Sequence, residues 1–375
     1  MISYWEKQAW THYDFLIIGG GIVGCFAALE VVKKHPKARI AILERGLFPN
    51  GASTKNAGFA CFGSLTEMEA DRHTLSTDEL LGLIDKRRKG LEKLRHTLGD
   101  RAIGFQATGG YELFQNPEEG LENRIHTINQ LLQPLLPKPV FVEASDQISA
   151  KGFNPNKVKH LISNPYEGLI HTGKMMRELH QKVTQKGIVY FAQTEVLELQ
   201  PGTSHHTLTV RAGKQTIDLH TKHLGICTNA FTQRWFPQET IHPGRGCVLI
   251  SKPLPKLNLE ACFHYQQGYY YFRAIDNRLL IGGGRQLDFD GENTTEMGIN
   301  PKIKKALIQD VNDFILPNGG FEVDMEWSGI MAFGDTKKPI VKAVDQHIVM
   351  GVRLGGMGVA IGSLIGEEVG KLLTA

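Results

Sequence analysis

The glycines of residues 19–24 are spaced in a way that could bind a diphosphate group. Gly19 would allow a tight turn, Gly21 would let backbone amides approach the phosphates, and Gly24 would let a helix pack closely on the preceding strand. The start of that helix would offer unpaired N–H groups and a partial positive charge. Glu44 follows Gly24 by twenty residues, where an acidic residue commonly accepts hydrogen bonds from ribose hydroxyls. We predict a dinucleotide site here.

The segment after Glu44 favours a flavin over a nicotinamide. Residues 46–64 are mostly small, hydroxyl or amide residues and include a single charged side chain, Lys55. Small residues in 51–58 would let a flat ring lie close to the backbone, and the polar groups could meet its edge. Such a composition is unusual for a plain surface loop, so we expect a long ring-binding loop over 46–64.

A second glycine-rich turn near the C-terminus does not repeat the first motif. In residues 356–362 the third glycine is displaced by one position. The following helix instead carries a glycine at every fourth position, at Gly358, Gly362, Gly366 and Gly370, which is typical of close helix packing. Its N-terminus could direct N–H donors at an electron-rich part of a ring. We therefore predict one dinucleotide site and no separate nicotinamide site.

The elements that must position the first motif follow from the apolar pattern. The run 13–18 is typical of a buried parallel strand, 22–34 has helical spacing, and 39–44 is a second strand. Strand, glycine turn, helix and strand within 44 residues are the context that gives the glycine pattern its meaning. Because similar elements recur at the C-terminus, the fold class is predicted as α/β, with a discontinuous Rossmann-like domain and a second α+β domain built on a mostly antiparallel sheet.

Further elements are assigned from periodicity and turn residues. Helices are expected over 3–10, 77–98, 119–136, 173–186 (with Thr172 as N-cap) and 301–315. A strand is expected within 105–114, and further strands over 188–191, 194–199, 269–275, 279–282, 323–331 and 347–352. A hairpin is expected from 208–210 and 216–219, with a separate buried stretch at 224–228.

Composition and charge exclude several classes of protein. The chain has 375 residues, with 42 basic and 39 acidic side chains and no long run of like charge, which gives no footprint for nucleic acid and no polybasic membrane anchor. The five cysteines are scattered without a Cys-x-x-Cys pair, so neither a disulfide framework nor a metal site is predicted. The apolar run 15–32 contains four glycines and Glu30, which argues against a spanning helix. A cytoplasmic protein is expected.

The ordered series of motifs resembles the D-amino-acid oxidase family of FAD-dependent oxidoreductases, which includes glycine oxidase, sarcosine oxidase and gamma-glutamylputrescine oxidoreductase. The resemblance spans nearly the whole chain. It is carried by DFLIIGGGIVG (14–24), ILERG (42–46), GASTKNAGFA (51–60), GLIHTGKMMREL (168–179), TEVLEL (194–199), CTNAF (227–231), PGRGCVLI (243–250), YYYFRAIDNRLLIGGGR (269–285) and GGMGVAIG (355–362).

The resemblance implies an FAD-binding domain formed by 1–75, 150–240 and 330–375, and a substrate domain formed by 76–149 and 241–329. It implies that the adenosine, the diphosphate, the ring edge and the flavin pyrimidine are held by Gly19, Gly21, Ile22, Val23, Gly24, Glu44, Arg45, Ala52, Ser53, Thr54, Lys55, Asn56, Ala57, Gly58, Val196, Thr228, Asn229, Gly356, Met357, Gly358 and Val359.

Family chemistry is hydride transfer from a carbon bearing an amine or a hydroxyl to the flavin, which carries the difficult step itself. A small-molecule amine or amino acid is the expected substrate, with oxygen or an electron carrier as acceptor. A 2-hydroxy acid, a nicotinamide-dependent dehydrogenase and a flavin-binding regulatory protein without turnover are the alternatives.

Three features depart from the family pattern. Met331 stands where amino-acid oxidases usually place an arginine that clamps the substrate carboxylate. Residues 321–334 contain no cysteine, so a non-covalent FAD is expected. In the C-terminal turn, Met357 and Ala360 occupy positions where family members often carry histidine and lysine.

The resemblance places Tyr270, Arg273 and Met331 in the substrate pocket. Strand alternation puts Tyr270 and Arg273 on opposite faces unless the strand bulges. The missing carboxylate clamp could be replaced by Arg245, Arg273, Arg285 or Arg353. His171 is interpreted as a capping or packing histidine.

Overall fold

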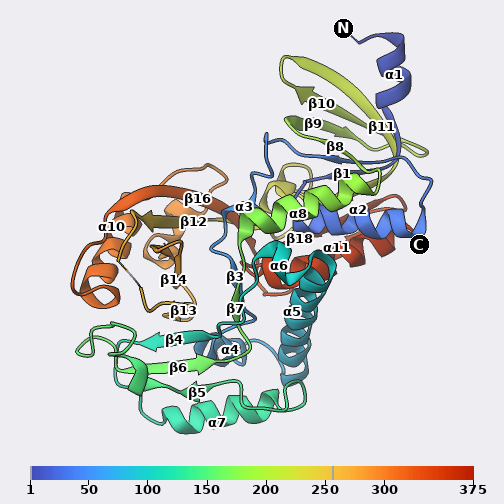
Figure 1. Cartoon of the computed structure of the whole chain (residues 1–375). Coiled ribbons are helices and arrows are strands. Elements are labelled where there is room, and N and C mark those ends of the chain that lie inside the picture. Colours follow the sequence, from blue (N-terminus) through green and yellow to red (C-terminus); the bar gives the residue numbers. More distant parts are fainter. Residues whose placement is uncertain (1, 256) are drawn as a thin grey trace.

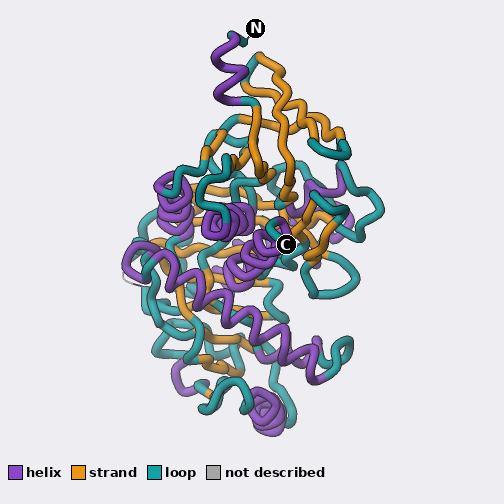
Figure 2. The backbone as a smooth tube through the Cα atoms, turned by 90° about the vertical axis from the view of Figure 1, so that its right-hand side faces the viewer, coloured by secondary structure: helices purple, strands orange, loops and turns teal. Residues whose placement is uncertain are grey.

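Two eight-stranded sheets organise the computed structural model, which describes residues 2–255 and 257–375 (Figure 1). Met1 and Lys256, which fall in the predicted domain segments 1–75 and 241–329, lie outside the described residues. The N-terminus and helix α1 lie at one end of the molecule in both views (Figure 1, Figure 2).

The first sheet is built around the apolar strand that precedes the glycine turn. Its strand order is β17-β18-β11-β1-β2-β8, with β9 and β10 attached to β11. The neighbours β11, β2 and β18 all run parallel along this core, as a Rossmann-like sheet requires. The strands are β1 His12–Ile18, β2 Ile40–Leu43, β8 Val189–Phe191, β9 Thr194–Gln200, β10 His206–Ala212, β11 Gln215–Ile226, β17 Ile340–Ala343 and β18 Ile348–Val352.

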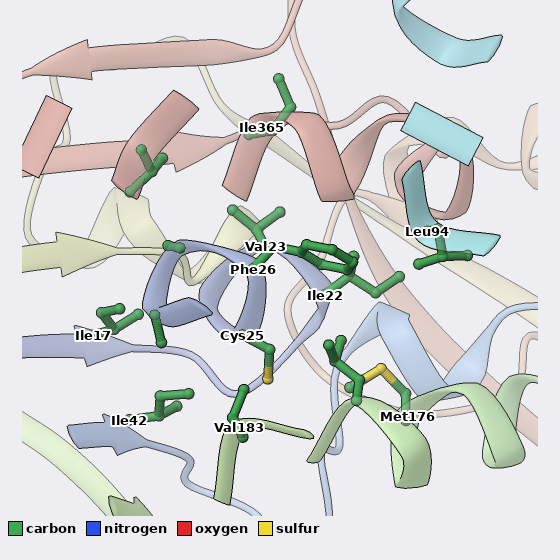
Figure 3. Close-up of a cluster of buried hydrophobic side chains, with 14 of the residues drawn as sticks. Ile17, Ile22, Val23, Cys25, Phe26, Ile42, Leu94, Met176, Val183 and Ile365 are labelled. Atoms are coloured by element: carbon green, nitrogen blue, oxygen red, sulfur yellow. The ribbon is translucent and has the colours of Figure 1, made fainter. Parts of the chain in front are cut away.

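Helices α2 (Ile22–Lys34) and α11 (Gly358–Leu373) cross at close range over this sheet. Side-chain carbons at Gly362, Gly366 and Gly370 would approach α2 atoms within 3.0, 2.5 and 2.6 Å, respectively. The predicted glycine stripe is confirmed at these three positions. Gly358 lies outside the contact, because its nearest neighbour is Leu354. Figure 3 shows the apolar core that this packing buries beside helix α8.

The second sheet is mostly antiparallel, as predicted, and has the order β16-β12-β15-β14-β13-β4-β6-β5. Its one parallel pair joins β13 to β4. The strands are β4 Gly110–Phe114, β5 Val142–Glu143, β6 His160–Asn164, β12 His242–Ser251, β13 Cys262–Tyr265, β14 Tyr270–Ile275, β15 Arg278–Gly283 and β16 Val323–Phe333. Stacked aromatic rings, such as Phe263 on Phe272, fill the core behind it.

The remaining elements connect and cover the two sheets. They are α1 Tyr4–Trp10, α3 Ala52–Lys55, β3 Phe59–Ala60, α4 Leu65–Asp71, α5 Thr77–Leu98, α6 Asp100–Ile103, α7 Leu121–Leu132, β7 Gly168–Leu169, α8 Thr172–Gln185, α9 Phe289–Glu292 and α10 Pro301–Asp310, which a π turn extends to Ile315. Among the described residues, no helix combines the length and apolar character needed to cross a membrane.

Several sequence expectations are corrected by the structure. Segment 46–64 is mostly loop, as expected, but it contains the short helix α3 and the short strand β3. The side chain of His171, rather than that of Thr172, caps α8 by accepting the Lys174 N–H, so the capping interpretation of His171 is confirmed. Residues 216–219 and 224–226 belong to one long strand, β11, which pairs with β10 along its first part and with β1 along its second, whereas 227–228 lie beyond its end. Strands β6, β12, β13 and β17 are not among the elements expected from the sequence.

The strand pairing bears on the predicted domain division. Strand β6 falls in segment 150–240 but pairs with β4 and β5 in the second sheet. Helix α5 falls in segment 76–149 but packs on α11, where Ser363 Oγ donates to the Gly90 carbonyl oxygen. The division into two domains stays a proposal, and we place β6 with the second sheet and α5 with the first.

Three histidines that lie close together in and beside the first sheet predict a loss of stability in acid. Ring centroids lie 6.2 Å apart for His206 and His347 and 5.1 Å apart for His223 and His347. Burial lowers the pKa of His206 and of His223. Below pH about 6.5 the unfolded chain therefore binds more protons than the folded one, and the free energy of unfolding falls as the pH drops.

Urea denaturation at a series of pH values will measure this effect. His206→Gln and His223→Gln should each flatten the acid side of the stability profile. His126→Gln, at an exposed position of α7, should leave the profile unchanged. Equal slopes in all four proteins would contradict the assignment.

Candidate active site

A cavity of about 1260 Å³ is lined by residues of both sheets. The first sheet contributes the glycine turn, the end of β2, part of β9, residues 227–235 and the turn before α11. The second sheet contributes residues of β12, β13, β14, β15 and β16. An elongated ligand could therefore bind along the carboxyl ends of the parallel strands, with one end covered by the antiparallel sheet.

The glycine turn has the backbone conformation that its sequence predicts. Gly19 has a φ of +106°, and a side-chain carbon there would lie 2.5 Å from the carbonyl oxygen of Cys227. A side-chain carbon at Gly24 would overlap the carbonyl oxygen of Gly19, so this glycine lets helix α2 pack on the turn. Helix α2 begins at Ile22 and has no side-chain cap from Gly21. The first residues of this helix, Ile22 and Val23, line the cavity, and a helix N-terminus stabilises an anion placed there.

Glu44 links the turn to the end of β2. This residue is only 7% exposed and lines the cavity, and its carboxylate accepts the Gly20 N–H at 3.2 Å and the Gly46 N–H at 2.9 Å. A carboxylate has about four acceptor sites, so these two bonds leave capacity for ribose hydroxyls. The next residue, Arg45, stacks its guanidinium over the Phe231 ring at 3.8 Å and also lines the cavity.

The short helix α3 carries the small polar residues to the cavity wall. Ser53 Oγ accepts the Ile22 N–H at 3.0 Å, which joins this loop to the start of α2. Asn56 accepts the Gly58 N–H at 2.9 Å and a hydrogen bond from Thr172 Oγ1 at 3.1 Å. From the second sheet, Trp327 Nε1–H donates to the Lys55 carbonyl oxygen at 3.0 Å. The loop is thus fixed from three sides.

The structure brings nearly all predicted cofactor residues to one cavity. Gly24, Thr54 and Gly58 lie behind its wall, where they shape the backbone. The residues that line it are Gly19, Gly21, Ile22, Val23, Glu44, Arg45, Ala52, Ser53, Lys55, Asn56, Ala57, Val196, Thr228, Asn229, Gly356, Met357, Gly358 and Val359.

Met331 also lines the cavity, beside the C-terminal turn. Its Sδ atom lies 3.6 Å from the point where a side-chain carbon of Gly356 would be, and the φ of Gly356 is +80°. Helix α11 begins two residues later, at Gly358, so its free N–H groups lie at the same end of the cavity.

Tyr270 and Arg273 do not line the cavity, which corrects their predicted place in the substrate pocket. Tyr270 is buried in the core of the second sheet, where its ring stacks on Tyr265 at 4.6 Å. The neighbours Tyr269 and Tyr271 face the cavity instead. The alternation of strand β14 could have identified them, had the inward face been known.

Arg273 is buried and holds the loop that follows α3. Its Nη1 donates to the carbonyl oxygens of Gly58 at 3.1 Å and Ile170 at 2.9 Å, and burial lowers its pKa to about 10. Arg273→Met should lower the free energy of unfolding by about 1.5–3 kcal/mol, the typical value of a hydrogen bond from a charged donor. Thermal melts and FAD titration of the apoprotein will measure this.

If Arg273 acts only on the loop, flavin-loaded Arg273→Met should keep the wild-type KM while its FAD affinity falls. A raised KM with unchanged FAD affinity would instead restore the predicted contact with substrate. Arg273→Lys keeps a charged donor, so its FAD affinity and its free energy of unfolding should lie between those of the wild type and Arg273→Met.

The other candidate arginines differ in their partners. Arg245 forms a two-pronged ion pair with Glu292, at 2.9 and 2.8 Å, and Arg353 Nη1 donates to the Thr240 carbonyl oxygen at 3.0 Å. Arg285 lies between two aromatic rings, with its Cζ 4.8 Å from the Phe289 centroid and 4.1 Å from that of Phe333.

Within residues 2–255 and 257–375, the Arg285 guanidinium has no hydrogen bond or ion pair to another protein group. It lines the cavity, and burial lowers its pKa. An arginine guanidinium stays protonated in proteins, so the cavity wall presents a partly desolvated positive charge.

The phosphate-binding turn, the ribose carboxylate and the small-residue loop fit a flavin dinucleotide, and together they define an FAD-binding oxidoreductase fold. Comparison with protein families agrees, because residues 14–372 match the model described as FAD dependent oxidoreductase. The chain belongs to this family and is an FAD-dependent enzyme.

Over most of the chain, the sequence identity to individual relatives is low. The chain is 25% identical to glycine oxidase of Geobacillus kaustophilus over 281 residues, which covers 72% of the chain and 70% of that protein. The crystal structure of glycine oxidase from the same organism covers 97% of the chain and 95% of its own length, with a TM-score of 0.77 at 18% identity, and shows the shared fold. A segment of 37 residues, 10% of the chain and 9% of the relative, is 51% identical to L-2-hydroxyglutarate dehydrogenase of Escherichia coli.

Proposed function

We propose that the enzyme oxidises an amine that carries a carboxylate, such as an amino acid, by hydride transfer to FAD. The observation that supports this is Arg285, a partly buried guanidinium that faces the cavity without a protein partner. A charged group kept in such a place is best stabilised by a ligand anion, and guanidinium pairs with carboxylate in a two-pronged fashion. Met331, at the position of the family's carboxylate-binding arginine, carries no charge, and Arg285 takes over the binding of the carboxylate.

The residues of this chain would act mainly by orientation. When bound, FAD accepts the hydride. Arg285 holds the carboxylate end of the substrate, and the Phe289 and Phe333 rings beside it keep the guanidinium in place. Tyr271 lines the cavity, and burial raises the pKa of its hydroxyl, so this group stays protonated and can donate a hydrogen bond. Alignment of the substrate C–H bond supplies the catalytic advantage.

A charged pair at another part of the wall is already neutralised. Lys337 Nζ lies 2.6 Å from the buried Asp71, and both residues line the cavity. This pair therefore competes little with Arg285 for the substrate carboxylate.

Oxidation of a 2-hydroxy acid is the second candidate. It is favoured by the short match to L-2-hydroxyglutarate dehydrogenase and by the fact that Arg285 would hold the carboxylate of a hydroxy acid equally well. The two kinds of substrate differ only in the atom bonded to the reacting carbon, nitrogen or oxygen, so an activity measurement is needed to distinguish them.

Anaerobic titration of the purified holoenzyme tests both candidates. Amino acids, N-substituted amino acids and 2-hydroxy acids are each compared with the matching compound that lacks the carboxylate. We expect flavin bleaching by a carboxylate-bearing amine and little by its decarboxylated counterpart. Bleaching only by hydroxy acids would establish the second candidate, and bleaching by no member would favour a flavin protein without turnover. Colour that returns rapidly in air would identify oxygen as the acceptor.

The same preparation tests the mode of FAD attachment. We propose non-covalent binding, so denaturation should release all yellow colour from the precipitated protein. A flavin that remains with the denatured chain would contradict this.

A further inference from the structure

Three segments far apart in the sequence bring a thiol, a carboxylate and an imidazole together at the cavity. Strands β3 and β7 pair with Phe59 opposite Leu169 and Ala60 opposite Gly168. Continued by one position, this register places Cys61 opposite Glu167. His264 approaches from β13 of the second sheet. One ligand atom from each of Cys61, Glu167 and His264 lies within 4.8 Å of the other two.

The cluster is enclosed by protein but open to the cavity. Glu167 is 2% exposed, whereas Cys61 and His264 both line the cavity. The Oε2 atom of Glu167 lies 3.2 Å from His264 Nε2 and 3.2 Å from the Sγ atom of Cys262. Among the described residues its Oε1 atom is buried without a hydrogen-bond partner.

We propose that Cys61, Glu167 and His264 bind a Zn²⁺ ion. Thiolate, carboxylate and imidazole are the ligands that Zn²⁺ takes in proteins, at about 2.0–2.3 Å. Two such ligands around a tetrahedral ion stand about 3.4 Å apart, close to the separation of the Glu167 and His264 atoms. Three protein ligands leave a fourth position, which here would face the cavity.

Charge balance distinguishes this site from a simple hydrogen-bonded cluster. One thiolate and one carboxylate neutralise a divalent cation, so the filled site adds no net charge to a buried region. Glu67 and Glu112, which act on His264 electrostatically, favour a cation there. The positive charge of Arg87 acts on Cys61 and disfavours a cation there. Its Nη1 donates to the Phe62 carbonyl oxygen at 3.0 Å. The unpartnered Oε1 of Glu167 is the atom that a hydrogen-bonded cluster leaves unexplained.

Metal binding to the intact holoenzyme tests the proposal without reference to the substrate. Calorimetric titration with Zn²⁺ should show a single equivalent bound, and Co²⁺ should give the long-wavelength bands of tetrahedral coordination, beyond the flavin absorption. Because loss of even an outer-shell partner weakens metal binding by about 10–100-fold, Cys61→Ser, Glu167→Gln and His264→Gln should each weaken Zn²⁺ binding at least about tenfold.

Cys247→Ser is the matched control. Cys247 is a buried thiol on β12 of the second sheet, which also carries His264, and it lies outside the cluster. It should bind Zn²⁺ like the wild type. The flavin spectrum of each variant reports whether it has folded. Absence of Zn²⁺ binding by the wild type, or equal binding by folded Cys61→Ser and His264→Gln, would overturn the proposal and leave the proposed function untouched.

Discussion

A Gly19→Ala variant is expected to lose its bound flavin. Its φ of +106° is a conformation that residues with a side chain rarely adopt, and the added carbon would lie 2.5 Å from the Cys227 carbonyl oxygen and 2.9 Å from its carbon. Both neighbours are backbone atoms, so neither can rotate away. The turn must therefore move away from the start of α2. A loss of about 3 kcal/mol of binding free energy would weaken FAD affinity roughly a hundredfold.

The ratio of flavin to protein absorbance after gel filtration will measure this loss, together with FAD titration of the apoprotein. Gly82→Ala is the matched control, because Gly82 is exposed on α5 and an added carbon would meet nothing within 4 Å. In a helix interior this change should stabilise the protein by up to about 1 kcal/mol and leave FAD binding intact. Wild-type FAD affinity in Gly19→Ala would contradict the assignment of the phosphate turn.

Arg285→Met is expected to reduce kcat/KM strongly for a carboxylate-bearing substrate. Loss of one partner of a buried charge pair costs about 2–5 kcal/mol, which corresponds to roughly a 30- to 5000-fold decrease. Because the guanidinium has no protein partner to leave unpaired, the free energy of unfolding should change little or increase. Steady-state kinetics and thermal melts will separate the two effects.

Two further variants sharpen this test. Arg285→Lys keeps the charge but loses the two-pronged geometry, so part of the activity should remain. Arg278→Met removes an arginine from the same strand region at a position paired with Asp324 at the surface, and should behave like the wild type. Equal kcat/KM in Arg285→Met and wild type, with an amino acid that bleaches the flavin, would exclude Arg285 as the carboxylate anchor.

The sequence alone predicted the parts of the site that lie close together along the chain. Strand β1, the glycine turn, α2 and the end of β2 occupy residues 12–44, and each follows from its own residues. An apolar run favours a buried strand, glycines permit the turn, and the carboxylate of Glu44 comes at the end of the next parallel strand. The cofactor residues predicted far from this segment, Val196, Thr228, Asn229 and 356–359, came from the family resemblance, and they line the same cavity.

Only the tertiary structure decided which side chains meet the substrate end of the cavity. Periodicity indicates that Tyr270 and Tyr271 face opposite ways but not which of them faces inward, since that depends on what packs behind strand β14. Four arginines were equal candidates, and only their partners separate Arg285 from Arg245, Arg273 and Arg353.

The cluster of Cys61, Glu167 and His264 shows the same limit most clearly. About a hundred residues separate each member from the next, so no spacing motif predicts it, and the scattered cysteines argued against a metal site. Register between β3 and β7, and the approach of β13, bring the three side chains together. Local sequence fixes backbone conformation through contacts within a few residues, whereas the pairing of distant strands decides which functional groups become neighbours.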